Sequence, residues 1–166
     1  MIRKLSLLAL IAATTCTSCQ ESKPKPEKEQ LTETTTKSEK LLAKLGAPKP
    51  SFAKDSILLS FTVVNNADSI QQFCRWETPF EPRIGKYLEI KDNEGKEATF
   101  MGAMARRVMP PPAETYIKVP AHDSVTTVFN VSTNYTVQGG DYTVKYTGGG
   151  VSGLETSNEL KINVKK

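Results

Sequence analysis

The chain has 166 residues. A β-sandwich with a sizeable core needs only about 100–130 residues, so one domain plus additional segments is expected. The formal net charge is +4, but from Ser51 onward the sequence holds 13 basic and 13 acidic residues. A globular part with this balance lacks the basic surface of a nucleic-acid-binding domain, and a nucleic-acid partner is therefore excluded.

Residues 1–18 have the parts of an export signal. Two basic residues near the start precede an apolar stretch from Leu5 to Ala13, which is too short to span a bilayer as a mature helix. Small residues then lead into CTSCQES, which resembles a bacterial lipoprotein signal with Cys19 as the acylated residue. Cys16 is the weaker alternative for acylation, and ordinary cleavage followed by secretion is the alternative to lipidation.

Lipidation would account for the cysteines and for the location of the protein. Cys16 would leave with the signal and Cys19 would carry lipid, so Cys74 would remain alone and no intrachain disulfide is expected. Each buried methylene of an acyl chain adds about 0.8 kcal/mol of membrane affinity. The sequence therefore predicts a lipid bilayer as partner in a bacterial cell envelope, with the outer membrane favoured and the body in the periplasm or at the cell surface.

Residues 19–40 are predicted to form a disordered tether. They are rich in Pro, Lys, Glu and Thr, and Leu31 is their only large apolar residue. As a coil, about twenty such residues span roughly 25 Å. The tether would hold the folded domain, residues 41–166, away from the lipid headgroups.

The centre of the predicted domain is a pair of strands within residues 57–80. Alternate residues from Ile57 to Val63, Phe61 among them, are apolar, which predicts a strand with one buried face. A turn follows, and then a second strand from Ile70 to Trp76 that Pro79 ends. Trp76 is the only tryptophan and is expected to anchor the core.

Short alternating segments with turns between them continue on both sides of this pair. An edge strand is expected in Leu41–Pro48, a hairpin around Gly95, and a long loop over Gly102–Thr115. Gly148-Gly149-Gly150 is interpreted as a flexible tip with no helix after it. Later strands are expected at Tyr116–Val119, Val125–Val131, Tyr142–Tyr146, with Tyr142 in the core, and Leu160–Val164. The pattern predicts an all-β, immunoglobulin-like antiparallel β-sandwich of about seven to nine strands.

The chain offers few groups for catalysis. It contains one histidine, His122, in a turn where a solvated surface role is expected. HExxH, GxSxG and phosphate-loop patterns are absent, so no catalytic residue, metal or cofactor is predicted. Cys74 is expected to be a buried, inert thiol. Three Asp-Ser pairs, beginning at Asp55, Asp68 and Asp123, fit either turns entering strands or a short O-glycosylation sequon, and turns are favoured.

Three segments carry a family resemblance: WETPF from Trp76 to Phe80, the loop from Gly102 to Arg107, and GDYTV from Gly140 to Val144. Over roughly Leu41 to Val164 the sequence resembles the N-terminal β-domain of bacterial deuterolysin and peptidyl-Lys metallopeptidases. The catalytic domain of that family, with its HExxH zinc ligands, has no counterpart in this chain. The resemblance therefore implies a sandwich without peptidase activity, and a peptidase as a candidate protein partner.

Two surfaces are candidates for binding a partner. Phe80 could belong to the core or to an exposed aromatic edge. The Pro-rich loop presents Arg106 and Arg107, which could contact a partner or could pair with Glu81 or Glu114 while the loop caps the sandwich. The favoured hypothesis is a non-enzymatic, membrane-anchored protein-binding domain, acting as a pro-domain-like inhibitor or folding helper. A carbohydrate-binding or structural envelope module is the alternative.

Overall fold

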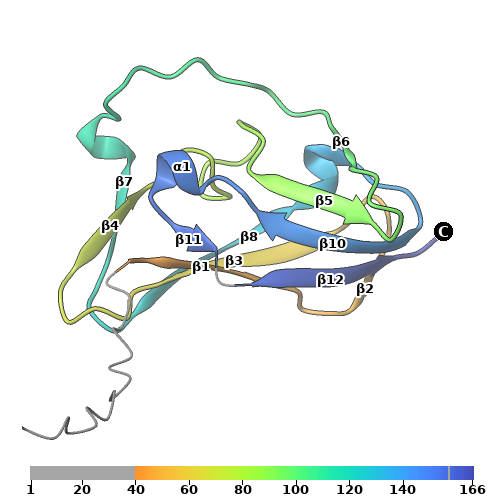
Figure 1. The fold of residues 1–166 in the computed structure, drawn as a ribbon, viewed down its shortest axis with the longest axis horizontal. Helices are drawn as coiled ribbons and strands as arrows, with labels where there is room; N and C mark the ends of the chain where they lie inside the picture. The colour runs from red at the N-terminus through yellow and green to blue at the C-terminus, as the bar shows by residue number, and fades with distance from the viewer. Residues whose placement is uncertain (1–39, 157) are drawn as a thin grey trace, which may run out of the picture. The chain divides into compact units, whose positions relative to one another are not determined.

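The computed structural model describes residues 40–156 and 158–166, and this part of the chain is an all-β sandwich (Figure 1). One sheet has the strand order β11-β1-β3-β8 and the other has the order β2-β12-β10-β5. Two further ladders pair β4 with β7 and β6 with β9. The strands are β1 (Leu42–Gly46), β2 (Ser51–Phe52), β3 (Leu58–Val64), β4 (Gln71–Cys74), β5 (Leu88–Asp92), β6 (Thr99–Phe100), β7 (Tyr116–Val119), β8 (Ser124–Asn130), β9 (Tyr135–Thr136), β10 (Gly140–Tyr146), β11 (Glu155–Thr156) and β12 (Glu159–Val164). Three short helical turns are η1 (Ala113–Thr115), η2 (Val131–Thr133) and α1 (Gly149–Ser152).

The predicted sandwich is therefore confirmed. Within the described residues, eight strands have four or more residues and four have two. Most pairs are antiparallel, but β1–β11 and β2–β12 are short parallel pairs. The predictions for residues 1–18 and the tether, including Cys16 and Cys19, lie outside the described residues, except that the last tether residue, Lys40, is described. In the described part, no helix has the length and apolar character needed to cross a membrane.

The core forms where the alternating segments of the two sheets face each other. Ile57, Leu59, Phe61 and Val63 are each 0% exposed, as the period-two pattern predicts. In the opposite sheet, alternate residues of β10, beginning with Tyr142, are also buried. Figure 1 shows these strands as two layers, with β5, β10 and β12 over β1, β3 and β8.

The two central strands do not pair with each other, contrary to the prediction. β3 lies between β1 and β8, whereas β4 pairs with β7. The chain changes ladders at Asn65, whose buried side-chain amide donates to the carbonyls of Ser69, Val119 and Pro120 at 2.9–3.0 Å. This amide satisfies carbonyls from two chain segments at the crossing. Ile70, expected on the inner face, is 67% exposed.

β1 is not an edge strand, which corrects the prediction for Leu41–Pro48. β11 pairs with its first half. Further along, Asn158 takes the place of a neighbouring strand, because its side chain accepts from Leu45 N (2.9 Å) and donates to Leu45 O (2.8 Å). A side-chain amide has the same donor and acceptor as a peptide group, so it can continue the ladder. No periodicity in the sequence indicates such a contact across more than a hundred residues.

Two glycine-containing turns differ in how well they were predicted. Gly95 has a φ of 82°, which confirms the left-handed position expected in the hairpin after β5. The Gly148–Gly150 segment is not a flexible tip, because Gly149–Ser152 forms a single helical turn. The Ser152 hydroxyl holds this turn, since it donates to Gly148 O (3.0 Å) and lies 2.7 Å from the Tyr146 hydroxyl.

Candidate binding surface

Both ends of the loop 102–115 are hydrogen-bonded to the segment that follows β4. At its start, Ala103 N donates to Arg83 O (3.2 Å), and Gly85 N donates to Ala103 O (2.8 Å). At its end, Arg75 N donates to the carbonyl of the last loop residue (2.9 Å). The loop is therefore tied down on both sides, although it has few regular elements of its own. It runs along the top of the molecule in Figure 1, between β6 and β7.

Arg107 attaches the middle of the loop to the same segment. Its Cζ lies 4.6 Å from the centroid of the Trp76 ring, and its Nη2 forms an ion pair with Glu81 Oε2. The side chains of Arg107 and Glu81 are only 26% and 16% exposed. A partly desolvated cation over an indole ring contributes about 0.5–2 kcal/mol. For Arg107, the alternative role is therefore confirmed: the guanidinium pairs with Glu81 inside the protein.

Trp76 is buried, but it is not the centre of the sandwich. It is 6% exposed, yet it does not belong to the main apolar cluster of the described residues, which contains both Phe61 and Tyr142. It follows β4 on an irregular segment, so its ring lies under Arg107 and not between the sheets. Phe61 takes the central place, and its ring centroid lies 4.9 Å from that of Tyr146. The expected burial of Trp76 is confirmed, although Phe61 and not Trp76 belongs to the main apolar cluster.

Phe80 lies at the border between core and surface. It is half-buried, and its ring centroid is 6.2 Å from that of Phe61 and 5.4 Å from that of Phe73. It also lines a groove beside β8. Phe80 therefore packs partly on the core, and its role in binding a partner stays a prediction.

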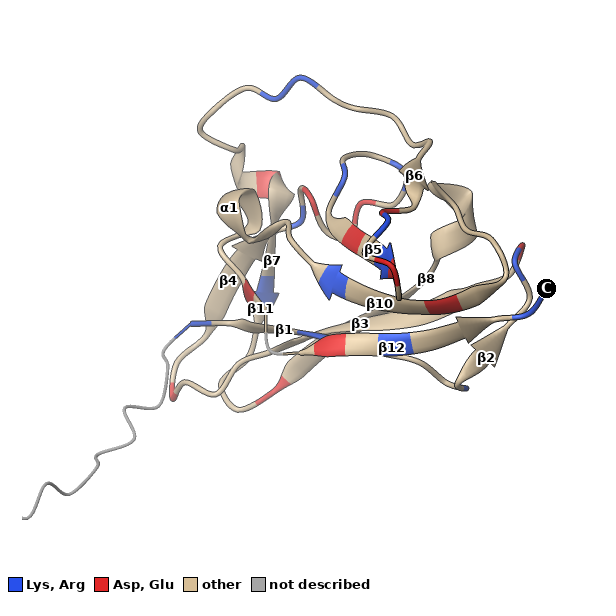
Figure 2. Cartoon of the chain, turned by 45° about the vertical axis from the view of Figure 1, so that its right-hand side comes forward, with Lys and Arg blue, Asp and Glu red and all other residues tan. Residues whose placement is uncertain are grey.

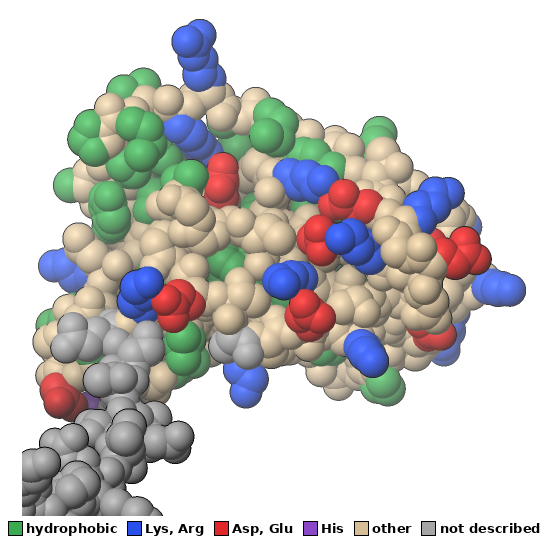
Figure 3. Space-filling view, viewed as in Figure 1, with side chains coloured by type: hydrophobic (Ala, Val, Ile, Leu, Met, Phe, Trp, Pro, Cys, Tyr) green, Lys and Arg blue, Asp and Glu red, His purple; other side chains and the backbone are tan. Residues whose placement is uncertain are grey.

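The loop and the residue just before it expose large apolar side chains. Met101, Met104, Val108 and Met109, here called the loop patch, are 68%, 72%, 79% and 64% exposed. They are four of the seven exposed large apolar side chains in the described part of the chain. Figure 3 shows hydrophobic side chains gathered at the upper left, and Figure 2 shows Lys and Arg at the crest of the loop. Arg106 is exposed there, unlike Arg107.

Arg106 and Arg107 are binding candidates from the sequence, whereas the exposed apolar residues beside them are not among the predicted site residues. The signal was available, because three of the four methionines of the chain fall within Met101–Met109, in a segment without strand alternation. Large apolar residues that no strand or helix can bury are expected at the surface. Sequence alone does not show which of two neighbouring arginines turns inward.

The two arginines predict different results for the Trp76 environment. Arg107→Ala should shift the tryptophan emission to longer wavelength and lower the free energy of unfolding by about 1–2 kcal/mol, because the indole loses its cover and Glu81 its partner. The matched variant Arg106→Ala should leave the emission unchanged and alter stability by no more than about 0.5 kcal/mol. Since Trp76 is the only tryptophan, fluorescence reports on this contact alone. Equal spectra for the two variants would contradict the assignment.

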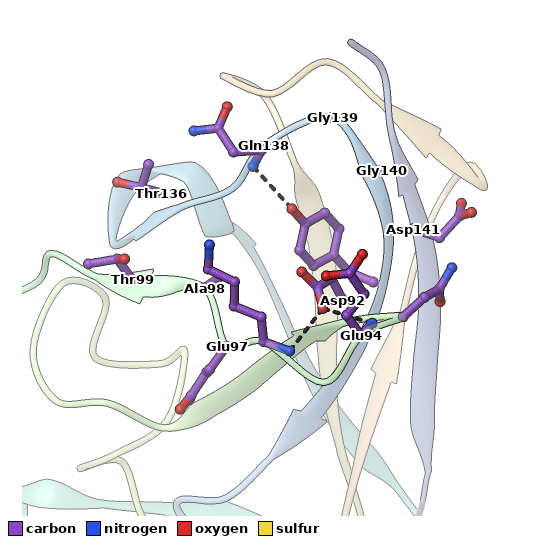
Figure 4. A pocket seen from close by; sticks show the side chains of 13 residues that line it. Asp92, Glu94, Glu97, Ala98, Thr99, Thr136, Gln138, Gly139, Gly140 and Asp141 are labelled. Atoms are coloured by element: carbon purple, nitrogen blue, oxygen red, sulfur yellow. Dashed lines mark hydrogen bonds between the residues drawn. The ribbon is translucent and has the colours of Figure 1, made fainter.

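A hollow of about 490 Å³ lies at the turn between β5 and β6, and Figure 4 shows its lining. Asp92 Oδ1 accepts from Glu94 N (3.0 Å) and Lys96 N (2.9 Å), so this carboxylate stabilises the turn. The Tyr142 hydroxyl accepts from Gln138 N (3.2 Å) at the opposite wall. These side chains are occupied in holding the two turns, and the hollow is open and polar.

Other reactive groups in the described residues lie apart from one another. His122 Nε2 lies 2.7 Å from Asp68 Oδ1 on the surface, with 54% of the histidine side chain exposed. Cys74 is buried, as predicted, with its Sγ 3.7 Å from Thr115 Oγ1. Within residues 40–156 and 158–166, no three His, Cys, Asp or Glu side chains are grouped so that they could hold a metal ion.

Comparison with known proteins does not give a family for this chain. No family model and no curated protein matches the sequence. Among solved structures, the chain is similar to one described as the crystal structure of the E. coli chaperone DraB, at 16% sequence identity and a TM-score of 0.25. The match covers 74% of this chain and 52% of that one, so the chain spans about half the length of that structure.

Proposed function

We propose that the protein is a non-enzymatic lipoprotein, anchored in a bacterial envelope membrane through acylated Cys19, and that its sandwich binds a protein partner through the loop patch. The single observation that carries the binding role is the exposure of Met101, Met104, Val108 and Met109 on a loop whose base is fixed. Several large apolar side chains that stay exposed along one short segment indicate an interaction site.

The loop suits binding because little order has to be gained. Its two ends are hydrogen-bonded and its middle is held by Arg107, so a partner would restrict few backbone torsions. Methionine side chains adapt to irregular apolar surfaces, which favours contact with a protein. The exposed Arg106 beside them adds a charged group of the kind found at interface hot spots.

A peptidase is the partner class we propose, and the support for it is the resemblance of the sequence to the N-terminal β-domain of metallopeptidases. The protein would then act as a detached inhibitor or folding helper for a peptidase. We favour protein over carbohydrate because the exposed large apolar side chains of the described part are aliphatic. Sugar rings stack best on aromatic faces.

Capture from envelope extracts tests the loop patch. The double variant Met104→Ser/Met109→Ser, on the full chain in detergent, should retain at least tenfold less partner than wild type, because both apolar contacts are lost. The matched control is Ile70→Ser, which removes an equally exposed apolar side chain elsewhere. Equal retention by wild type and the double variant would contradict the proposal.

The same preparations address the partner and the anchor. A peptidase among the proteins retained by wild type, and lost with the double variant, supports the peptidase association. In the cells used for the extracts, Cys19→Ser should move the protein from the membrane fraction to the soluble fraction. A Cys19→Ser protein that stays in the membrane fraction would contradict the lipid anchor without affecting the result for the loop patch.

A further inference from the structure

β8 forms a free edge of its sheet. It pairs with β3 on one side, and no described strand pairs with it on the other. The hydrogen bonds at the two ends of the β3–β8 ladder show which residues of β8 bond to β3. At these ends, Asn65 N donates to Asp123 O and Val131 N donates to Ile57 O, both at 2.9 Å. Odd-numbered residues therefore turn their backbone polar groups toward β3, and even-numbered residues turn theirs outward.

Thr126 and Val128 are the outward residues in the middle of this edge. Their backbone N–H and C=O groups form no hydrogen bond with the described residues. Val128 is 63% exposed, so the edge is accessible there. Proteins usually protect a long edge with Lys, Pro, a bulge or a covering element. The seven residues of β8, SVTTVFN, include no charge, proline or glycine.

A groove runs beside the second half of this edge. It lies between β8 and residues 79–87, has a volume of about 350 Å³, and is lined on its apolar side by Phe80, Tyr87 and Phe129. Inward side chains of β8 face this groove, so an additional strand at the edge would direct alternate side chains into it. The volume accommodates one or two such side chains.

Tyr87 and Arg83 add polar groups that lack partners. Tyr87 is 2% exposed, and its hydroxyl forms no hydrogen bond with a described residue. No fully enclosed side-chain N or O atom in the described part lacks a partner, so this hydroxyl keeps some exposure, and Tyr87 is one of the residues that line the groove. Desolvation raises the pKa of Tyr87 to about 12, so the hydroxyl is a proton donor at neutral pH.

Arg83 is the one charged residue among those that line the groove. Its side chain is exposed, and its guanidinium forms no ion pair with a described carboxylate. The groove therefore has an uncompensated positive charge next to an apolar wall and a row of unpaired backbone groups.

We propose that the free edge of β8 and this groove bind an extended peptide segment of another protein. The segment adds as a strand to Thr126 and Val128, inserts an apolar side chain between Phe80 and Tyr87, and places an acidic group near Arg83. Main-chain hydrogen bonds would supply affinity, and the groove would supply specificity. This site does not involve the loop patch.

The charge of the groove favours such a peptide over a second copy of the chain. In a symmetric dimer, β8 would face β8 of the partner copy, which carries no carboxylate between Ser124 and Asn130, and the adjacent Asp123 carboxylate already accepts from Ser124 N (2.7 Å). A strand with acidic residues supplies a free carboxylate for Arg83, and the Tyr87 hydroxyl can donate to a carbonyl or hydroxyl oxygen of the same strand. An acidic, apolar peptide meets both groups.

Fluorescence anisotropy with three proteins tests the site. The probes are two labelled octapeptides that alternate Thr with Val or Leu, one with a Glu at each end and one with a Lys at each end. Wild-type full chain in detergent should bind the Glu peptide about tenfold more tightly than the Lys peptide. Arg83→Glu should reverse this preference, and Ile70→Ser should behave as wild type. Equal affinities of wild type for the two peptides would overturn the proposal.

Amide hydrogen exchange tests strand addition without any substitution. The amides of Thr126 and Val128 should exchange fast in the free protein and at least tenfold more slowly with the Glu peptide, because they gain hydrogen bonds. The amide of Asn93, in a distant turn, should not change. Exchange at Thr126 and Val128 that is unaffected by the peptide overturns the proposal. Protection that rises with protein concentration in the absence of peptide also overturns it, since a second copy would then occupy the edge.

Discussion

Phe61→Ala is expected to lower the free energy of unfolding by about 4 kcal/mol, enough to unfold a domain of ordinary stability at moderate temperature. Phe61 is 0% exposed at the centre of β3, and its ring meets that of Tyr146 from the opposite sheet and that of Phe80 from the segment between β4 and β5. Truncation would remove the transfer free energy of the ring and leave a cavity that neighbours anchored in two sheets fill only in part.

Denaturant unfolding checks this expectation, with Leu58→Ala as the matched control. Leu58 is the first residue of the same strand, three positions before Phe61, but it points outward and is 41% exposed. Its truncation should cost about 1 kcal/mol or less. If the two variants lost equal stability, β3 would not have one inner and one outer face, and the two-layer arrangement would be wrong.

Gly148→Ala should destabilise the protein by about 3 kcal/mol, through a steric cause. A Cβ on Gly148 would lie 2.0 Å from the carbonyl oxygen of Glu77 and 3.0 Å from the Tyr146 hydroxyl. That carbonyl is backbone and accepts a hydrogen bond from Tyr146 (3.1 Å), so it has little freedom to move away. The substitution would therefore push the α1 turn away from Glu77, which lies in the segment after β4.

The matched control for Gly148→Ala lies two residues away. A Cβ on Gly150 meets nothing within 4 Å, and Gly150 lies within α1, where alanine is the better helix former. Gly150→Ala should therefore leave stability unchanged or raise it by up to about 1 kcal/mol. Thermal unfolding of the two variants gives the comparison. A Gly148→Ala protein as stable as wild type would mean that the contact between α1 and Glu77 is not formed in solution.

Most strands could be predicted because the residue pattern that indicates a strand lies within the strand itself. Alternation of apolar residues on β3 and β10 gives a buried face whatever the strand pairs with, and the predicted Tyr116–Val119 strand is found with those bounds. Gly95 was recognisable because a short hairpin needs a left-handed residue. These features depend on neighbours within a few positions in the sequence.

The remaining features depend on contacts between distant residues. Asn158 substitutes for a strand beside Leu45, and the amide of Asn65 joins the ends of two other segments, but neither contact has a periodic signal. The same holds for the candidate site. Arg107 and Arg106 have the same chemistry, and only the position of Trp76 and Glu81 in the fold distinguishes their roles. The free edge of β8 likewise becomes visible only with the strand order.

The position of β1 has a mechanical consequence. It is the first strand after the tether, and β3 holds it on one side while β11 and Asn158 hold it on the other. If Cys19 is the anchor, any tension between the membrane and a bound partner acts along β1. Such a pull loads two rows of hydrogen bonds in shear at once, whereas a strand at a sheet border would peel away bond by bond. The domain would thus resist extraction at its N-terminus.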